Sequence, residues 1–249
     1  MILIGKYMKK LNFFFKILYN FFMKNEKKFC KCCNSLLDEV ILVKDKKYNF
    51  CTNCKSVFLD CEFYLSSENQ KDRYLLHNNT LEDAGYKNYL EKFFEDVLSV
   101  AKEKNHTYLD YGSGPNPCLV DLVKQKYSDF EQIDAWDLFF TKDFTPKENF
   151  YSLITCLEVA EHFENPIESF LHMKSLLKND GILALQTQIF YPEDDFEKTS
   201  KKFATWWYKE DTTHVTFYSK EGLINCCKNC GLEFLTQINK NLLVFTKKD

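Results

Sequence analysis

The chain has 249 residues and a formal net charge of −3, and 45% of its residues are hydrophobic and 16% aromatic. This length accommodates one well-buried α/β domain plus a small accessory module, and the composition excludes an intrinsically disordered chain. The first 24 residues hold five lysines and no acid, which leaves 28 basic against 36 acidic residues in the remainder and argues against a free-standing nucleic-acid binder.

Residues 1–28 form an apolar and basic leader, which we expect to be disordered or an amphipathic helix. Its charge-free runs, residues 11–15 and 17–23, are shorter than the roughly 20 apolar residues that a transmembrane helix needs. We therefore expect no transmembrane segment; weak contact of residues 1–23 with a membrane surface and translation from a later methionine both stay open. No cleavable signal peptide is visible, so we expect a cytoplasmic protein with reduced cysteines.

Residues 29–65 contain two cysteine pairs in the pattern C-x2-C-x17-C-x2-C. The four cysteines are Cys30, Cys33, Cys51 and Cys54. This spacing is typical of a zinc site in which each pair supplies two thiolates from one tight turn. Two nearby cysteines complicate the assignment, because Cys32 could replace a neighbouring ligand and Cys61 is either a stray thiol or lies beside the ligands.

Two short strands are expected between the cysteine pairs, at residues 40–43 and 48–50, as in a zinc-ribbon-like module. Such a hairpin is too small to hold itself together, so zinc binding would supply its folding energy. Because all four thiolates would bind the metal, no coordination position is open for a substrate. The predicted role of the zinc ion is structural.

Residues 66–105 are expected to form a helical connector that caps the core. Apolar residues recur at helical spacing between Tyr86 and Ala101. Residues 73–79 gather a tyrosine, a histidine, two asparagines and the only arginine of the chain, Arg73. A guanidinium can bind a carboxylate through two parallel hydrogen bonds, which lysine cannot reproduce, so Arg73 is predicted to bind a ligand carboxylate. The alternative is that residues 73–79 are only the polar end of a helix and bind no ligand.

Residues 106–249 are expected to form a doubly wound α/β core. A strand at residues 107–111 leads into a turn with Gly112 and Gly114, and a helix follows at residues 119–126. Glycine lets the backbone approach a ligand closely, and the amides at a helix start favour negative charge. This strand–turn–helix unit is the ligand-binding corner of a doubly wound sheet.

A second strand, at residues 132–137, ends in an acid that can bind ribose hydroxyls. Asp137 is the expected residue and Asp134 remains a rival. The remaining expected elements are a strand at 151–156, a helix at 166–177 and a strand at 182–187. Strands that alternate with helices in this way predict a parallel sheet with helices on both faces.

Four runs in this order resemble the motifs of class I S-adenosylmethionine-dependent methyltransferases. They are LDYGSGP at 109–115, WDLFF at 136–140, ITCLEVAEHF at 154–163 and LLKNDGIL at 176–183. The chain is also similar to an uncharacterised bacterial subgroup of that family, which begins with a four-cysteine module and carries a late D-x-T-H-V motif, here at 211–215. The chain departs from the family motifs in three ways: Asn116 replaces the third loop glycine, Ser152 replaces a common aspartate, and Asp110 and the ribose acid lie slightly far apart in the sequence.

The resemblance implies a Rossmann-like, mostly parallel seven-stranded sheet that binds S-adenosyl-L-methionine. The cofactor-binding residues that follow from it and from the arginine argument are Arg73, Asp110, Gly112, Gly114, Asp137 and Glu158. The acceptor must lose a proton during methyl transfer, and the candidates to take it are His214 and His162, with Glu161 as their partner. A hydrogen-bonded structural histidine is the alternative for His162.

The predicted acceptor is a small molecule: a sugar, a quinone or another metabolite that offers a hydroxyl or a carbon. The alternative is an rRNA or tRNA base, with the zinc module recognising RNA, and it is second because the body of the chain is acidic. A catalytically silent cofactor-binding protein is a third hypothesis, which the intact motifs do not favour. The sequence predicts no oligomeric state.

Overall fold

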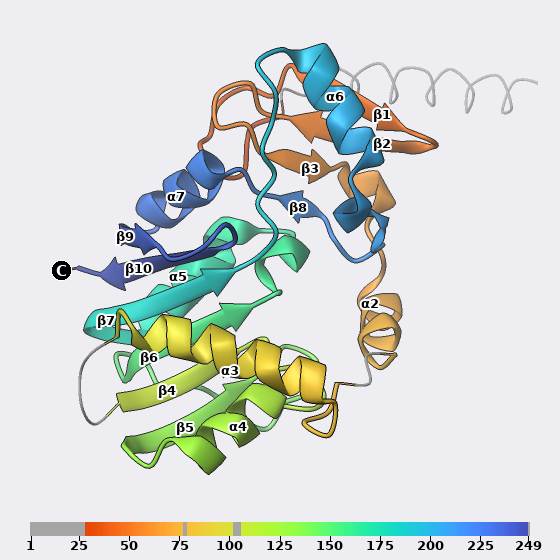
Figure 1. Cartoon of the computed structure of the whole chain (residues 1–249). Helices are drawn as coiled ribbons and strands as arrows, with labels where there is room; N and C mark the ends of the chain where they lie inside the picture. Colours follow the sequence, from red (N-terminus) through yellow and green to blue (C-terminus); the bar gives the residue numbers. More distant parts are fainter. Residues whose placement is uncertain (1–27, 77–78, 102–105, 249) are drawn as a thin grey trace, which may run out of the picture.

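The computed structural model describes residues 28–76, 79–101 and 106–248 (Figure 1). The predicted leader therefore lies outside the described residues except for its last one, and so do His77 and Asn78 of the polar segment. Within the described part of the chain, no helix has the length and apolar character to cross a membrane.

The residues around the two cysteine pairs form a small antiparallel sheet with the strand order β1-β2-β3-β8. Its strands are β1 (Glu39–Val43), β2 (Lys46–Phe50), β3 (Val57–Leu59) and β8 (Thr216–Phe217). The predicted hairpin is β1 and β2. The helix α6 (Phe196–Thr205) packs on this sheet through Phe203, whose ring centroid lies 5.0 Å from that of Tyr48 and 5.1 Å from that of Phe217. Because β8 and α6 come from the C-terminal third of the chain, the cysteine-bearing sheet is built into the rest of the molecule.

A short 3-10 turn ends the predicted zinc module, and two helices form the predicted connector. These elements are η1 (Cys61–Phe63), α2 (Ser67–Tyr74) and α3 (Ala84–Leu98). The side chain of Ser66 accepts a hydrogen bond from the backbone N–H of Asn69 at the start of α2, and Asp83 caps α3 in the same way. Helix α3 buries one apolar face against the core, whereas α2 buries none of its residues fully.

The core is a six-stranded sheet with the order β5-β4-β6-β7-β10-β9. Its strands are β4 (His106–Tyr111), β5 (Phe130–Trp136), β6 (Tyr151–Leu157), β7 (Leu177–Gln186), β9 (Leu232–Gln237) and β10 (Leu242–Lys247). The pairs from β5 to β7 are parallel, and β10 is antiparallel to both neighbours. The doubly wound, mostly parallel α/β architecture was therefore predicted correctly.

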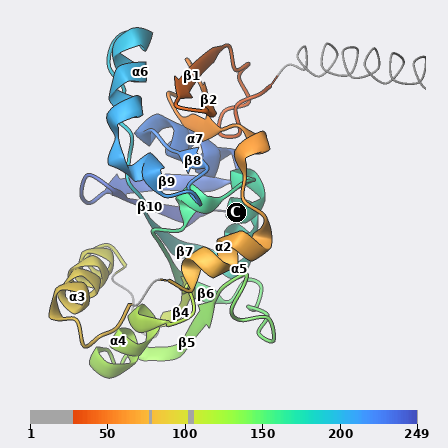
Figure 2. The same cartoon turned by 90° about the vertical axis from the view of Figure 1, so that its right-hand side faces the viewer.

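Helices cover both faces of this sheet (Figure 2). The helices are α3 and α4 (Cys118–Lys126) on one side, and α5 (Pro166–Leu176) and α7 (Lys220–Asn229) on the other. Side chains alternate along each strand, so Tyr108 packs with the α3 side while its neighbour Leu109 packs with the α5 side. Leu153 and Ile154 divide between the faces in the same way.

The expected seventh strand is absent from the described residues. Residues 137–150, between β5 and β6, form only turns and irregular backbone. One crossover with its helix takes at least about 10–12 residues, so this segment cannot hold another strand together with the two helices that would flank it. The count of seven was wrong because it came from the family resemblance rather than from the length of this segment.

Candidate active site

A cavity of about 1170 Å³ lies at the carboxyl ends of the parallel strands. The loops after β4, β5 and β6 line it together with residues of α2 and of the η3 turn (Trp207–Glu210). Figure 1 shows α2 beyond the ends of these strands. Ligands bind at this edge in open α/β sheets, so the cavity is the candidate active site.

The glycine turn after β4 forms one wall of the cavity. Gly112 and Gly114 have φ angles of +83° and +68°, which L-residues rarely adopt. The backbone N–H groups of Gly112 and Ser113 both donate to the carbonyl oxygen of Trp136, at 2.7 and 3.1 Å, and so tie the turn to the end of β5. A Cβ on Gly112 would lie 2.5 Å from Cγ2 of Val159, whereas a Cβ on Gly114 would meet nothing within 4 Å.

Asp137 lies next to this turn. Its Oδ2 accepts a hydrogen bond from the N–H of Gly114 at 3.0 Å, and its Oδ1 accepts one from the N–H of Phe139 at 2.8 Å. Asp134 instead accepts hydrogen bonds from Gln132 and Tyr151, and within the described part of the chain it is not among the residues that line the cavity. The sequence did not decide whether Asp134 or Asp137 binds ribose, and of these two acids only Asp137 lines the cavity.

Asp110, near the end of β4, is 5% exposed and lines the cavity. Its Oδ1 accepts a hydrogen bond from Thr155 Oγ1 at 2.9 Å. Burial raises the pKa of Asp110 to about 7, against the lowering effect of that hydrogen bond. Two buried oxygens of the same lining, Ser113 Oγ and Glu158 Oε1, have no hydrogen-bond partner among the described residues. Buried polar atoms are normally paired, so these two point to a ligand.

Glu158 follows β6 and has a φ of +52°. Tyr208 donates a hydrogen bond to its Oε2 at 3.0 Å. Burial, together with the neighbouring charge of Glu161, raises the pKa of Glu158 to about 8. A non-glycine residue in this backbone region is strained, which is a feature of ligand sites.

Glu161, His162 and His214 meet at one point of the cavity wall. Glu161 is 1% exposed, and its Oε1 lies 3.9 Å from Nε2 of each histidine. Its other oxygen accepts a hydrogen bond from Thr187 Oγ1 at 2.7 Å. The two imidazole centroids are 4.8 Å apart. Burial lowers the pKa of His214, which favours its neutral ring.

Arg73, on α2, lines the cavity and has a partner within the chain. Its Nη2 lies 2.9 Å from Oδ2 of Asp211. Burial alone would raise the pKa of Asp211, but hydrogen bonds from Thr213 and the neighbouring positive charge of Arg73 lower it to about 2. The ion pair ties α2 to the segment that carries His214.

Several side chains for which the sequence analysis assigned no role orient the site residues. They are Thr155, Thr187, Tyr208 and Asp211. Asp211 belongs to the D-x-T-H-V motif and Thr155 to the fourth-strand motif, so both carried a signal. Tyr208 belongs to the polar and aromatic stretch that ends at His214, and Thr187 carried no signal.

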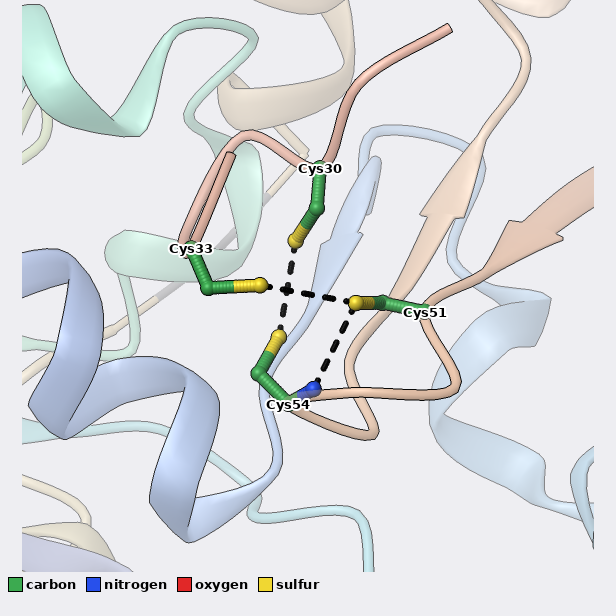
Figure 3. Close-up of side chains that lie close together, drawn as sticks. All are labelled: Cys30, Cys33, Cys51 and Cys54. Atoms are coloured by element: carbon green, nitrogen blue, oxygen red, sulfur yellow. Dashed lines mark hydrogen bonds between the residues drawn. The ribbon is translucent and has the colours of Figure 1, made fainter. Parts of the chain in front are cut away.

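The four predicted cysteines point their sulfur atoms at one centre (Figure 3). The Sγ atoms of Cys30 and Cys54 are 3.4 Å apart, and those of Cys33 and Cys51 are 3.5 Å apart. A tetrahedral zinc ion with Zn–S bonds of about 2.3 Å needs sulfur–sulfur distances only slightly longer, about 3.8 Å. Cys32 and Cys61 lie outside this set.

The two cysteine turns have the same backbone geometry. The N–H of Asn34 donates to the carbonyl of Cys30 at 2.9 Å, and that of Lys55 donates to the carbonyl of Cys51 at 2.8 Å. Asn34 and Lys55 have φ angles of +59° and +63°. Asparagine adopts the left-handed backbone more readily than most residues, whereas lysine carries no such preference.

A family model described as a methyltransferase domain matches residues 83–237, and the chain belongs to this family. It is therefore a methyltransferase, an enzyme of the transferase class. No curated protein matches the chain.

Solved structures of low sequence identity share the fold. One is 1,6-didemethyltoxoflavin-N1-methyltransferase of Burkholderia thailandensis with bound 1,6-didemethyltoxoflavin and S-adenosylhomocysteine, at 8% identity over 85% of this chain and 100% of that chain, with a TM-score of 0.50. Another is a complex between the Haloferax volcanii Trm112 methyltransferase activator and a candidate methyltransferase, at 11% identity over 74% of this chain and 98% of that chain, with a TM-score of 0.50.

Proposed function

We propose that this methyltransferase transfers the methyl group of S-adenosylmethionine to a hydroxyl or a carbon of a small-molecule acceptor. The observation that carries the proposal is the pair of acids, Asp110 and Asp137, on either side of the glycine turn in one cavity at the carboxyl edge of the sheet. The Burkholderia thailandensis structure of the same fold, with its bound S-adenosylhomocysteine, supports the choice of cofactor.

The residues of the cavity fit this cofactor. Asp137 would accept hydrogen bonds from the ribose hydroxyls, and ionised Asp110 would pair with the ammonium of the methionine end. Gly112 and Gly114 leave room for the cofactor beside the backbone. The Oγ of Ser113, which has no hydrogen-bond partner among the described residues, lies in the same lining and offers a further polar contact. Arg73 donates one N–H to Asp211, and its other N–H groups would bind a ligand carboxylate.

The transfer is an in-line displacement. The acceptor atom forms a bond to the methyl carbon while the carbon–sulfur bond breaks, and the sulfonium sulfur keeps the electron pair as a thioether. Alignment and exclusion of water supply most of the acceleration. The acceptor proton goes to the cluster of Glu161, His162 and His214, whose residues line the cavity.

The charge of the cavity favours a small, non-phosphorylated acceptor over RNA. Eight carboxyl groups and one guanidinium belong to the residues that line it. The acids are Asp110, Asp137, Glu158, Glu161, Glu164, Glu168, Glu210 and Asp211. This lining would repel a phosphate backbone and attract a cationic cofactor.

Labelling with S-adenosylmethionine that carries a deuterated methyl group tests the acceptor. The protein is incubated with a metabolite extract and, separately, with total RNA, and mass spectrometry follows the label. We expect label in a metabolite and none with Asp137→Ala. Label in an RNA base would support the alternative instead, and no label in either sample would contradict the proposal.

We also propose that Cys30, Cys33, Cys51 and Cys54 hold one structural zinc ion. The sulfur–sulfur distances and the matched turns support it. No coordination position would remain for a substrate, so the zinc ion would act on the fold and not on the transfer.

A further inference from the structure

The point where Glu161, His162 and His214 meet has the donor atoms of a second metal site, separate from the four cysteines. The three ligand atoms, one carboxylate oxygen and two imidazole nitrogens, lie within 4.8 Å of one another. We propose that this cluster binds one divalent transition-metal ion, and that the acceptor binds to that ion through a hydroxyl oxygen. The inference rests on the proposed function and narrows its acceptor to a hydroxyl.

Hydrogen bonds to the backbone decide which nitrogen of each ring faces the centre of the cluster. Nδ1 of His214 lies 2.7 Å from the carbonyl oxygen of Tyr208, and Nδ1 of His162 lies 3.1 Å from that of Thr213. A carbonyl oxygen only accepts, so each Nδ1 carries the proton and Nε2 of the neutral ring presents its lone pair. Metal-binding histidines are oriented in this way, with the second nitrogen donating to a carbonyl group.

The three ligand atoms face one point, where a cation would join them. Glu161 Oε1 lies 3.9 Å from both Nε2 atoms, which is too long for a hydrogen bond. An ion at about 2.0–2.2 Å from each ligand would join all three. Thr187 holds the other carboxylate oxygen of Glu161 and so directs Oε1 toward the histidines.

Glu158 supplies a fourth candidate ligand. Tyr208 holds its Oε2 at 3.0 Å, while its Oε1 is buried and has no hydrogen-bond partner among the described residues. Two imidazoles with carboxylates suit a first-row transition ion better than Ca²⁺ or Mg²⁺, which prefer oxygen ligands throughout.

All four ligand residues line the cavity, so the remaining coordination positions face the acceptor. A hydroxyl bound to the ion has a lowered pKa and loses its proton to solvent. The resulting oxygen attacks the methyl carbon, and the thioether of the cofactor leaves. In this arrangement the two histidines act as ligands, and solvent takes the acceptor proton in place of the cluster.

Titration with Mn²⁺ tests the site without any need for turnover. The full chain is first loaded with one zinc ion at the cysteines, and Mn²⁺ is then added in the absence of cofactor and acceptor and followed by electron paramagnetic resonance. We expect one Mn²⁺ per chain with the zinc content unchanged. Glu161→Gln and His214→Gln should each weaken binding at least tenfold, as should His214→Ala.

His172 provides the matched control, because it lines the same cavity but bonds to the hydroxyl of Tyr111 at 3.0 Å. His172→Asn should leave the Mn²⁺ affinity unchanged, and Glu161→Asp should retain part of it. Thermal unfolding identifies variants that fail to fold, and the conclusion is drawn from those that fold. The inference is overturned if the wild-type chain takes up neither Mn²⁺ nor Co²⁺ beyond its zinc, or if Glu161→Gln and His214→Gln bind Mn²⁺ as tightly as wild type.

A titration of the same wild-type sample with S-adenosylmethionine separates the two proposals. Cofactor binding without a second metal ion contradicts this inference alone. A second metal ion without cofactor binding contradicts the proposed function alone.

Discussion

At the scale of single residues, Gly112 and Gly114 share a left-handed backbone but differ in the space around them. Gly112→Ala should lower the free energy of unfolding by about 2–4 kcal/mol, because the methyl group would overlap Val159 in addition to the backbone strain. Gly114→Ala should cost only about 1–2 kcal/mol, from the strain alone. Urea unfolding of the two variants measures the difference.

Val159→Ala gives the internal control for this pair. In the Gly112→Ala/Val159→Ala double variant the overlap is removed, so the two substitutions should cost less together than the sum of their separate costs. If Gly112→Ala and Gly114→Ala lower the free energy of unfolding equally, and if Val159→Ala does not change the effect of Gly112→Ala, the close packing of Gly112 against Val159 is contradicted.

The buried carboxyl of Asp110 makes stability depend on pH. Burial raises its folded-state pKa to about 7, whereas the unfolded chain has an ordinary value of about 3.9. As the pH rises, the carboxyl ionises in the unfolded chain at about pH 4, whereas in the folded chain it stays protonated up to about pH 7. Ionisation therefore favours the unfolded chain, and the free energy of unfolding falls as the pH rises from about 4 to 7.

Asp110→Asn removes this dependence. Relative to wild type, the variant should gain about 1–3 kcal/mol between pH 4 and pH 8 in urea unfolding, with little difference below pH 4. Parallel pH profiles for the two proteins would show that Asp110 ionises normally in the fold.

The sequence predicted the residues of the glycine turn because they are contiguous, and contiguous residues share one local structure. It left Asp134 and Asp137 open because that choice depends on where β5 ends, and strand ends are poorly defined by sequence patterns. The pairing of Arg73 with Asp211 joins residues 138 positions apart and has no periodic signal. This ion pair could be predicted only from the folded structure.

At the scale of elements, the cysteine turns and the β1–β2 hairpin depend on each other. Cys54→Ser should lower the melting temperature by on the order of 10 °C, because a zinc site stabilises a module that has little core of its own. Cys61→Ser is the matched control: Cys61 is exposed and outside the four-cysteine set, so its melting temperature should stay within about 2 °C of wild type.

Elemental analysis of the same preparations should give about one zinc ion per chain for wild type and for Cys61→Ser, and less for Cys54→Ser. Equal melting temperatures for the two variants, or a wild-type chain that melts unchanged after chelation, would exclude a structural zinc ion.

The sequence predicted the hairpin and most core elements because their hydrophobic patterns are local. It did not predict β8, whose two residues carry no alternation, or the six-stranded core sheet, which follows from the short segment between β5 and β6. β7 begins at Leu177 rather than at the expected residue 182, but its pairing with β6 is interrupted between Leu177 and Ile182, where Asp180 has a φ of +58°.

At the scale of the whole molecule, one backbone segment connects the cysteine-bearing sheet to the cavity. The carbonyl of Val215 accepts a hydrogen bond from the N–H of Leu59 in β3, and the N–H of Val215 donates to the carbonyl of Glu161, both at 2.9 Å. His214 precedes this residue directly. The cysteine-bearing sheet therefore holds the segment that carries part of the candidate active site.

The matched methyltransferase domain covers residues 83–237, yet residues before it line the cavity as well. Arg73 and Tyr74 of α2 are among them. Tyr74 packs edge-on against His162, with ring centroids 5.2 Å apart. The N-terminal third of the chain thus contributes to the cavity as well as to the fold.

Isothermal titration with S-adenosylmethionine tests the central claim most directly. The wild-type chain should bind one cofactor, and Asp137→Ala should weaken binding by about 1–3 kcal/mol, through the loss of charge-assisted hydrogen bonds. Asp134 lies in β5, just before Asp137 in the chain but outside the cavity lining, so Asp134→Ala should leave the affinity within about twofold. A wild-type chain that binds no cofactor, or an affinity that depends on Asp134 and not on Asp137, would contradict the account.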